Sequence, residues 1–397
     1  MVINMIYLDN AATTKVSEAV FEKMKPYFCK EYANPSAVYS FASNSMKAVS
    51  EAREILASLI GANANEIYFT SGGSESDNWA IKAVAEANKE KGKHIITSKI
   101  EHHAVLHTLK YLEKQGYEVS YIDVDEYGVI KLEELKKAVR NDTILITVMT
   151  ANNEIGSIQP IAEIGDIAKE YGILFHTDAV QAYGHISLNV KEMNIDLLSA
   201  SAHKLNGPKG VGFLYIRNGM RIGAFMHGGA QERSRRAGTH NTAGIAGFGE
   251  AARIAYETLD ERAKKQIELR DYLIKRVLEE IPYSRLNGDM INRLPNNAHF
   301  CFRFIEGESL LILLDQKGIC ASSGSACTSG SLDPSHVLLA IGLEHEIAHG
   351  SLRLTLSEEN TKDEIDFVVD QLKGIVARLR EMSPLYEDFV TVQSQAD

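Results

Sequence analysis

Short apolar runs alternate with amphipathic helical segments through the middle of the chain, and no other feature constrains the fold as strongly. Parallel strands need long crossover connections, usually helices, so this alternation predicts βαβ units. It therefore indicates an α/β fold with a mostly parallel sheet that helices cover on both faces. The expected strands are 66–70, 94–98, 119–122, 144–149, 173–177 and 196–199, and the helices between them include 132–139 and 161–171.

Further segments extend this plan at both ends. Residues 211–216 follow strand 196–199 too closely for a crossover helix, so these two strands are predicted to be antiparallel. A long helix at about 245–280, charged in its second half, suits a bridge between two domains. The polar tail 390–397 is expected to fray. The other expected elements are helices at 16–28, 45–60, near 75 and 309–317, strands at 297–304 and 351–356, and a final amphipathic helix.

A chain of 397 residues is expected to form two domains, here a large one at 15–258 and a small α+β one at 1–14 with 259–397. The net charge of -11 argues against nucleic acid or an anionic membrane as the main partner. No run approaches the ~20 apolar residues of a membrane span, and the first ten residues do not resemble a signal peptide. Four cysteines without metal-ligand spacing indicate a reducing, cytoplasmic compartment.

Two residues follow consecutive strands at the sheet edge where open α/β folds bind ligands. Asp178 could hold a protonated pyridine nitrogen there, and the alternative is that it caps the next segment. Lys204 lies in a loop of small residues, where a lowered pKa would make it a Schiff-base nucleophile. A solvated loop lysine is the alternative. Pyridoxal phosphate needs both an acidic partner and a lysine, so the pair predicts that cofactor.

Two further loops complete the predicted cofactor site. The segment 70–77 (TSGGSESD) follows a strand and opens a helix, so its N–H groups and the Ser74 hydroxyl could bind a phosphate. A simple capping box is the alternative. In the segment 101–103 (EHH), a histidine could stack on the cofactor and exchange protons, and a buried, satisfied histidine is the alternative. Adjacent residues on a strand point to opposite faces, so the two histidines make a poor metal site.

A reactive thiol is predicted in the segment 321–330 (ASSGSACTSG). This run of Gly, Ser, Ala and Thr cannot pack as core, and a cysteine kept in such a loop, here Cys327, is expected to react. The other cysteines, Cys29, Cys301 and Cys320, are expected to be small buried hydrophobes. Arg353, in an apolar strand, requires a carboxylate partner from the protein or from a substrate.

Together these segments resemble the class I cysteine desulfurases, the NifS/IscS group of fold-type I pyridoxal-phosphate enzymes. The resemblance extends from 7–14 (YLDNAATT) to 383–386 (SPLY), nearly the whole chain. It implies removal of sulfur from L-cysteine, with L-alanine and a persulfide on Cys327 as products, and transfer of the sulfur to a protein acceptor such as an iron–sulfur scaffold. Its most specific parts are 176–181 (HTDAVQ), 200–204 (ASAHK), 236–239 (RAGT) and 322–327 (SSGSAC).

The resemblance also implies roles for individual residues. Lys204 would hold the cofactor covalently and remove the Cα proton, Asp178 would pair with the pyridinium nitrogen, and His102 would stack on the ring and manage thiol protons. Asn34, Asn153 and Arg353 would bind the substrate. No resident metal is implied, although Cys327 could be a transient iron–sulfur ligand. The remaining cofactor contacts would come from Gly73, Ser74, Asn153, Gln181, Ser201 and His203, and from Thr239 of the neighbouring subunit of a homodimer.

The chain departs from the family pattern at two places, and other activities stay open. Tyr39 stands where the family commonly has a histidine, and the sequence after Phe389 lacks the longer extension through which some members engage an iron–sulfur scaffold. The contact implied for Thr239 with a neighbouring subunit would place the arginines at 233, 235 and 236 at a subunit interface, which explains them without nucleic-acid binding. The alternatives are an aminotransferase, a selenocysteine lyase, or an assembly subunit without catalysis. Iron–sulfur assembly and tRNA thiolation are both open as destinations of the sulfur.

Overall fold

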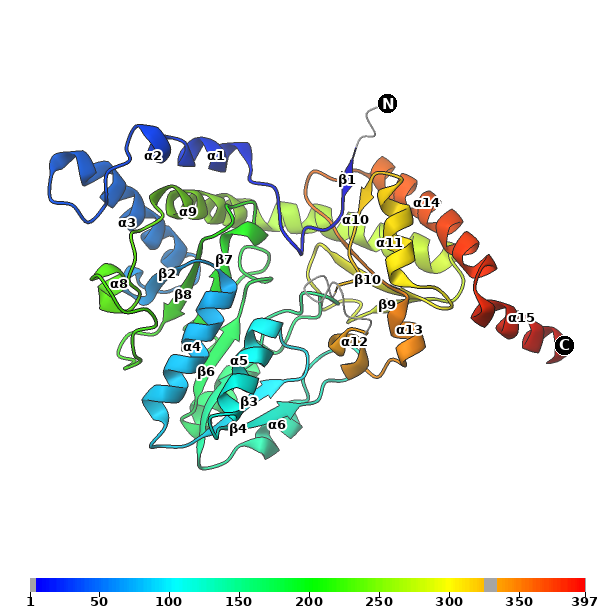
Figure 1. The fold of residues 1–397 in the computed structure, drawn as a ribbon, viewed down its shortest axis with the longest axis horizontal. Coiled ribbons are helices and arrows are strands. Elements are labelled where there is room, and N and C mark those ends of the chain that lie inside the picture. Colours follow the sequence, from blue (N-terminus) through cyan, green and yellow to red (C-terminus); the bar gives the residue numbers. More distant parts are fainter. Residues whose placement is uncertain (1–4, 325–333, 397) are drawn as a thin grey trace.

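A seven-stranded sheet organises the larger of two lobes in the computed structural model, which describes residues 5–324 and 334–396 (Figure 1). The strand order is β2-β8-β7-β6-β5-β3-β4. Neighbours from β7 to β4 are parallel, and β8 runs antiparallel to both β7 and β2. The mostly parallel sheet and its antiparallel pair are therefore confirmed. The strands are β2 (Ile67–Thr70), β3 (His94–Ser98), β4 (Glu118–Ile122), β5 (Thr143–Thr147), β6 (Leu174–Asp178), β7 (Leu197–Ser201) and β8 (Gly212–Ile216).

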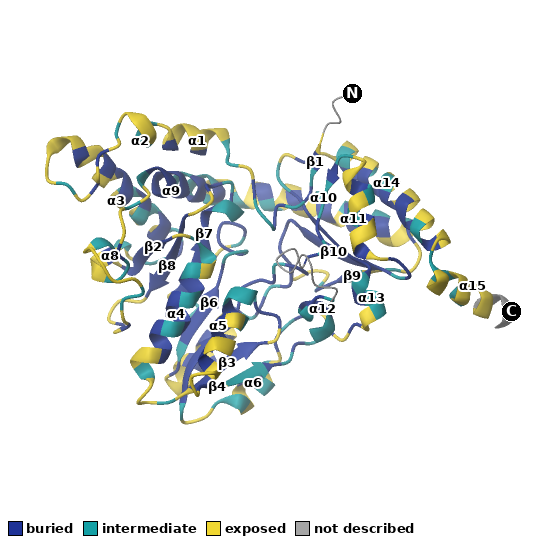
Figure 2. Ribbon diagram, in the orientation of Figure 1, coloured by how far each residue is buried: buried dark blue, intermediate teal, exposed yellow. Residues whose placement is uncertain are grey.

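Helices cover both faces of this sheet, as the fully buried strands require. One apolar cluster contains Trp79 and Val84 of α4 with Leu109 of α5. A separate cluster contains Leu56 of α3 and Phe248 of α9. Apart from the edge strand β4, the strands between these clusters are dark in Figure 2 because they are almost completely buried. The helices are α3 (Ser43–Ser58), α4 (Gly73–Asn88), α5 (His103–Glu113), α6 (Leu132–Ala138), α7 (Ile161–Tyr171) and α9 (Thr242–Glu257).

The smaller lobe has its own sheet and core. β9 (Ser284–Asn287), β10 (Asn297–Phe302) and β12 (Ser351–Thr355) pair antiparallel, and β1 (Ile6–Tyr7) runs parallel to β11 (Ile319–Cys320). Ile6 and Leu8 belong to this core, which otherwise draws on residues after 272. The proposed domain boundaries at 14 and 258 stay predictions. The helices are α10 (Leu259–Glu280), α11 (Gly307–Asp315), α12 (His336–Ala340), α13 (His345–His349), α14 (Lys362–Glu381) and α15 (Pro384–Ala396).

Two predicted helical segments are helical in the structure, but each is interrupted once. The segment 16–28 forms α1 (Glu18–Met24) and α2 (Pro26–Cys29), since Pro26 has no N–H to continue the first helix. The segment 245–280 divides at Thr258, whose φ of -107° and ψ of 10° are not helical. Short 3-10 turns, η1 (Ser40–Ala42), η2 (Ala64–Glu66) and η3 (Ala202–Lys204), and the short helix α8 (Gln231–Ser234) complete the elements.

The expectations for the tail and for Cys29 were wrong. The tail is helical as far as Ala396, and Phe389 packs its ring 4.8 Å from Phe304 and 5.2 Å from Tyr283, which holds α15 against the small lobe. Cys29 is exposed because α2 buries none of its residues, whereas Cys301 is buried as expected. Over the described ranges, no helix combines the length and the apolar character needed to cross a bilayer.

Candidate active site

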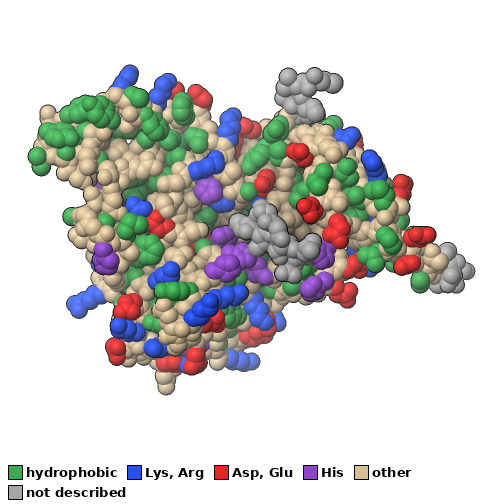
Figure 3. Space-filling model, in the orientation of Figure 1, with side chains coloured by type: hydrophobic (Ala, Val, Ile, Leu, Met, Phe, Trp, Pro, Cys, Tyr) green, Lys and Arg blue, Asp and Glu red, His purple; other side chains and the backbone are tan. Residues whose placement is uncertain are grey.

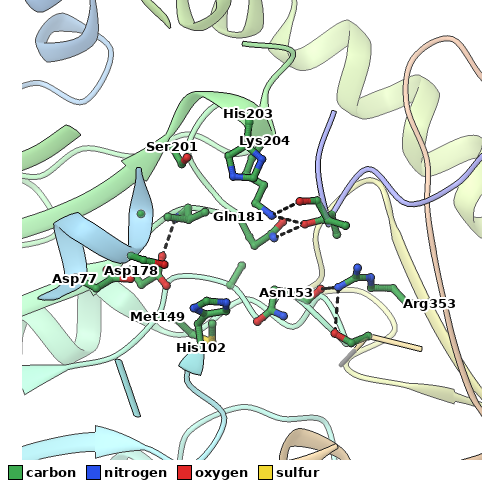
Figure 4. A pocket seen from close by; sticks show the side chains of 17 residues that line it. Asp77, His102, Met149, Asn153, Asp178, Gln181, Ser201, His203, Lys204 and Arg353 are labelled. Atoms are coloured by element: carbon green, nitrogen blue, oxygen red, sulfur yellow. Dashed lines mark hydrogen bonds between the residues drawn. The ribbon is translucent and has the colours of Figure 1, made fainter. Parts of the chain in front are cut away.

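The loops after β2, β3, β5, β6 and β7 meet at one edge of the large sheet, beside the small lobe, and enclose a cavity of about 320 Å³ (Figure 4). Such an edge is where open α/β sheets bind ligands. Strand-end residues in its lining are His102, Asn153, Asp178, Gln181 and Lys204. Gly73, Ser74, Ser201 and His203 line one end, and Arg353 reaches it from the small lobe.

Asp178 ends β6 and is 5% exposed, so its carboxyl group belongs to the cavity wall. Its Oδ1 accepts a hydrogen bond of 2.9 Å from the N–H of Val180, which means that Asp178 also caps the next segment. Burial raises the pKa of Asp178, while the Val180 N–H and the charge of Lys204 act to lower it. The capping role and a place in the cavity are thus compatible.

Lys204 follows β7 at the end of η3, and its amine lies inside the cavity instead of in solvent (Figure 4). Its Nζ donates to the carbonyl oxygens of Ala11 at 2.6 Å and Ala12 at 2.8 Å. Gln181 donates to the same Ala11 carbonyl at 2.9 Å. The N-terminal segment therefore forms the wall opposite the sheet, which the sequence analysis did not anticipate.

One end of the cavity is suited to an anion. Helix α4 begins there at Gly73, and the N–H groups of a helix N-terminus attract negative charge. A Cβ atom on Gly73 would lie 2.5 Å from Cγ2 of Val180, so a larger residue would displace the wall beside Asp178. Ser74, Ser201 and His203 are shared with an adjoining cavity of about 350 Å³. That cavity adds Lys209, a cation that the sequence analysis missed.

The capping box expected as the alternative for this loop is not formed, because the N-cap of α4 is Gly72, which has no side chain to accept a hydrogen bond. Glu75 accepts a 2.8 Å hydrogen bond from the N–H of Ser71, which closes the turn before α4. Glu75 also pairs with Arg236 at 2.7 Å, and Arg235 donates to the Tyr68 hydroxyl at 3.0 Å. Arg233 donates to the carbonyl oxygen of Ile67 at 2.8 Å, so all three members of the arginine cluster are occupied within the chain.

His102, and not His103, lines the cavity. It lies at the N-cap of α5 instead of on a strand, and its Nδ1 accepts a 3.1 Å hydrogen bond from the N–H of Ala104. Burial, followed by the charge of Lys204, lowers the pKa of His102 to about 4, so its ring is neutral near pH 7. His103 packs away from the cavity, with its ring centroid 5.0 Å from those of His107 and His336. In the part of the chain that the structure describes, no group of three or more metal-ligating side chains could hold a metal.

Arg353 lies on β12 and is 2% exposed. Its Nη1 donates to the carbonyl oxygen of Asn153 at 2.9 Å, and its Nη2 pairs with Asp9 at 2.9 Å. The expected carboxylate partner is therefore supplied by the protein. Nε of Arg353 is buried and has no hydrogen-bond partner within residues 5–324 and 334–396.

Three predicted site residues are not brought to this cavity within one chain. Asn34 is exposed after α2, and its Oδ1 accepts a 3.0 Å hydrogen bond from the N–H of Ser36. Thr239 is exposed in the segment before α9. Cys327 lies outside the described residues, although Gly324 on its N-terminal side lines the cavity. The roles of all three stay predictions.

Comparisons with known proteins identify the family of the chain. A family described as "Aminotransferase class-V" matches residues 6–368. "Cysteine desulfurase IscS" of Clostridium botulinum (strain Hall) is 56% identical over 387 residues, 97% of this chain and 98% of that protein. A solved "NIFS-LIKE PROTEIN" has a TM-score of 0.89 at 40% identity and covers 94% of this chain and 100% of its own. The solved structure "SspA in complex with cysteine" has a TM-score of 0.80 at 37% identity, and the match covers 90% of this chain and 100% of that chain.

Proposed function

The chain belongs to the class-V aminotransferase family and is a cysteine desulfurase, and from this premise we propose that it uses pyridoxal phosphate held by Lys204 and Asp178 to transfer the sulfur of L-cysteine to Cys327. One observation carries the proposal. A buried carboxylate and a lysine amine face the same cavity from the ends of neighbouring strands, β6 and β7. The anion-binding end at Gly73 and Ser74 lies in that same cavity.

The residues present fit the cofactor at three points. Asp178 would accept a hydrogen bond from the ring nitrogen, and Lys204 would form the Schiff base with the aldehyde carbon. The N-terminus of α4 would bind the phosphate. When bound, pyridoxal phosphate withdraws electrons from the substrate Cα. Lys204 then takes the Cα proton onto Nζ, and Asp178 keeps the ring nitrogen protonated through a charge-assisted hydrogen bond.

The substrate carboxylate is proposed to bind Arg353 and Asn153 at the small-lobe side of the cavity. Arg353 lines the cavity, and its positive charge would be stabilised by a carboxylate bound there. His102 is neutral near pH 7 and its Nδ1 accepts from the Ala104 N–H, so its Nε2 carries the ring proton and can donate a hydrogen bond to a thiolate.

In the sulfur transfer, the thiolate of Cys327 attacks the sulfur of the bound cysteine. An S–S bond forms and the C–S bond breaks, the carbon fragment keeps the electron pair, and protonation releases it as L-alanine. Cys327 is left as a persulfide, which passes its outer sulfur to a second thiol-bearing protein. An iron–sulfur scaffold protein is the acceptor class that we propose.

A homodimer is also proposed. Thr239 is exposed and outside its own cavity, which is consistent with a role at the neighbouring subunit. Apolar side chains gather over α2 and α3, at the upper left of Figure 3, and large exposed apolar patches mark interaction sites. The most exposed of them are Phe28, Tyr32, Val38, Tyr39 and Met46.

The experiment supplies L-cysteine and a reductant to the purified, cofactor-loaded protein and measures alanine and sulfide. We expect equal amounts of both. Cys327→Ala should abolish sulfide release, whereas Cys29→Ala, which removes an exposed thiol, should leave the rate unchanged. Lys204→Ala should remove both the Schiff-base absorbance and the activity.

Three results would contradict the proposal. Sulfide release that survives Cys327→Ala would remove the persulfide step. A keto acid in place of alanine would indicate an aminotransferase. A kcat/KM for selenocysteine at least a hundredfold above that for cysteine would indicate a selenocysteine lyase.

A further inference from the structure

Asp77 lies near the start of α4, and its carboxyl group forms part of the cavity wall although the function described above does not use it (Figure 4). It is 1% exposed. Figure 4 shows its carboxyl group beside that of Asp178. Oδ1 of Asp77 has no hydrogen-bond partner in the described part of the chain. A buried polar atom left in this state costs free energy, so it requires an explanation.

The ionisable groups around Asp77 do not supply a compensating positive charge. His176 approaches from β6, with Nε2 at 3.6 Å from Oδ1 of Asp77. Its two ring nitrogens are already bonded to Thr147 at 2.8 Å and Ser199 at 3.0 Å, and burial lowers its pKa to about 3, so it is neutral. Glu101, after β3, is itself a buried acid whose pKa burial raises to about 8.

Asp178 is favoured over Asp77 as the site of the single negative charge. It accepts the N–H of Val180, and the charge of Lys204 lowers its pKa. For Asp77, burial and then the neighbouring charge of Asp178 raise the pKa well above its usual value, against a hydrogen bond from Ser199. Two adjacent buried carboxyl groups do not both ionise near pH 7, and they share a proton instead.

We infer that Asp77 keeps its proton and donates it to Asp178, and is thereby a positioning residue for the carboxylate that faces the cofactor ring. The donated hydrogen bond gives Oδ1 of Asp77 a use and fixes the second oxygen of Asp178, since the Val180 N–H already fixes the first. The remaining lone pairs of Asp178 are then directed into the cavity. The role toward the ring rests on the proposed function, but the protonation of Asp77 does not.

Infrared spectroscopy of the full chain at pH 7, with and without pyridoxal phosphate, tests the proton directly. The wild-type minus Asp77→Asn difference spectrum should contain the carbonyl stretch of a protonated carboxylic acid in both states. Glu101→Gln identifies the separate band of the other buried acid. Loss of an ionised carboxylate band in the Asp77→Asn difference would overturn the inference, whatever the cofactor does.

Cofactor affinity tests the positioning role. Asp77→Asn keeps an N–H donor toward Asp178, so its dissociation constant for pyridoxal phosphate should stay within about threefold of the wild type. Asp77→Leu removes the donor and should weaken binding about tenfold, equivalent to about 1.4 kcal/mol, with a more pH-dependent absorbance of the bound cofactor. Equal affinity and equal spectra for Asp77→Leu and the wild type would overturn the positioning role. Failure of the wild type to bind pyridoxal phosphate would instead refute the proposed function and leave the infrared result standing.

Discussion

Nη2 of Arg353 lies 2.9 Å from Oδ1 of Asp9, and this pair joins β12 of the small lobe to the N-terminal segment beside the cavity that Arg353 lines. The side chains of Arg353 and Asp9 are 3% and 20% exposed. Because Asp9 pairs with Nη2 and the carbonyl oxygen of Asn153 accepts from Nη1, the guanidinium plane has a defined orientation. The ion pair therefore holds Arg353 in place for the substrate-binding role proposed above.

Asp9→Asn should raise the KM for L-cysteine about tenfold and change kcat less than threefold, because a charge-assisted hydrogen bond of about 1.5–3 kcal/mol no longer orients Arg353. Steady-state kinetics over a range of cysteine concentrations measure the effect. Glu359→Gln is the matched control, since Glu359 pairs with the exposed Lys15 at 3.8 Å and should not change KM. An unchanged KM in Asp9→Asn would show that Arg353 does not depend on this ion pair.

His102 should make the protein less stable in acid. Its pKa is about 4 in the fold and about 6.5 in an unfolded chain, so between these values the unfolded chain binds more protons. The free energy of unfolding therefore falls as pH falls from 6.5 to 4, by up to about 1.4 kcal/mol per pH unit for this group. His102→Gln should reduce that loss in urea titrations at pH 6.5 and 4.5. The same slope in both proteins would contradict a neutral His102.

Glu232, shortly before the segment 236–239, is expected to contribute strongly to the free energy of unfolding. Its carboxylate pairs with Arg53 at 2.6 Å and accepts from the Phe69 N–H at 2.8 Å. Burial acts to raise its pKa, but the hydrogen bonds from Arg53 and His240 outweigh this and lower the pKa to about 2. Glu232→Gln should cost about 3–5 kcal/mol of unfolding free energy, because Arg53 is left without its charge partner.

The pH dependence of this contribution has a definite sign. Since the pKa of Glu232 is lowered by folding, its stabilisation is complete above about 4.5 and is lost as pH falls toward 2. Denaturant titrations at pH 7 and pH 3.5 measure it. Glu257→Gln, which breaks the exposed pair with Arg253, should cost less than about 1 kcal/mol. Equal losses in the two variants would show that burial does not strengthen the Glu232 pair.

The sequence predicted the parts of the fold that depend on local pattern. Buried strands have apolar sequences, which makes them visible in the sequence. The predicted bounds of β3 match the observed ones, and those of the other predicted sheet strands differ by at most about two residues. The breaks at Pro26 and Thr258 were missed because apolar periodicity continues across both. The helical tail was missed because Phe389 is stabilised by Phe304, and polar composition does not reveal that contact.

The candidate site shows the same division. Asp178, Lys204 and Ser74 could be found because each follows a strand, and strand ends converge. Residue chemistry alone did not separate His102 from His103; the family resemblance selected His102, and the cap geometry of α5 accounts for its place in the cavity. Asp9 could not be paired with Arg353 because they come from opposite ends of the chain, and Asp77 was missed because a polar residue in the first turns of a helix usually faces solvent.

Thr239 should serve the cavity of the partner subunit. Lys204→Ala and Thr239→Asp protomers should each have little activity alone, whereas refolding an equal mixture should restore about a quarter of the wild-type activity. In a mixed dimer one cavity carries both changes and the other carries neither. Absence of recovery, with mixed dimers present, would place Thr239 outside the partner's site.

The apolar surface over α2 and α3 should hold the dimer together. Val38 is fully exposed in the single chain and Tyr39 is 55% exposed, so a subunit contact that covers them removes apolar area from water. Val38→Asp with Tyr39→Asp should convert the dimer to a monomer in sedimentation velocity and lower activity at least tenfold, because each cavity loses the partner's residues. Tyr171→Asp, at the end of α7, adds a charge at another exposed aromatic and should leave the dimer intact. A dimer that survives the double change would show that its interface lies elsewhere on the molecule.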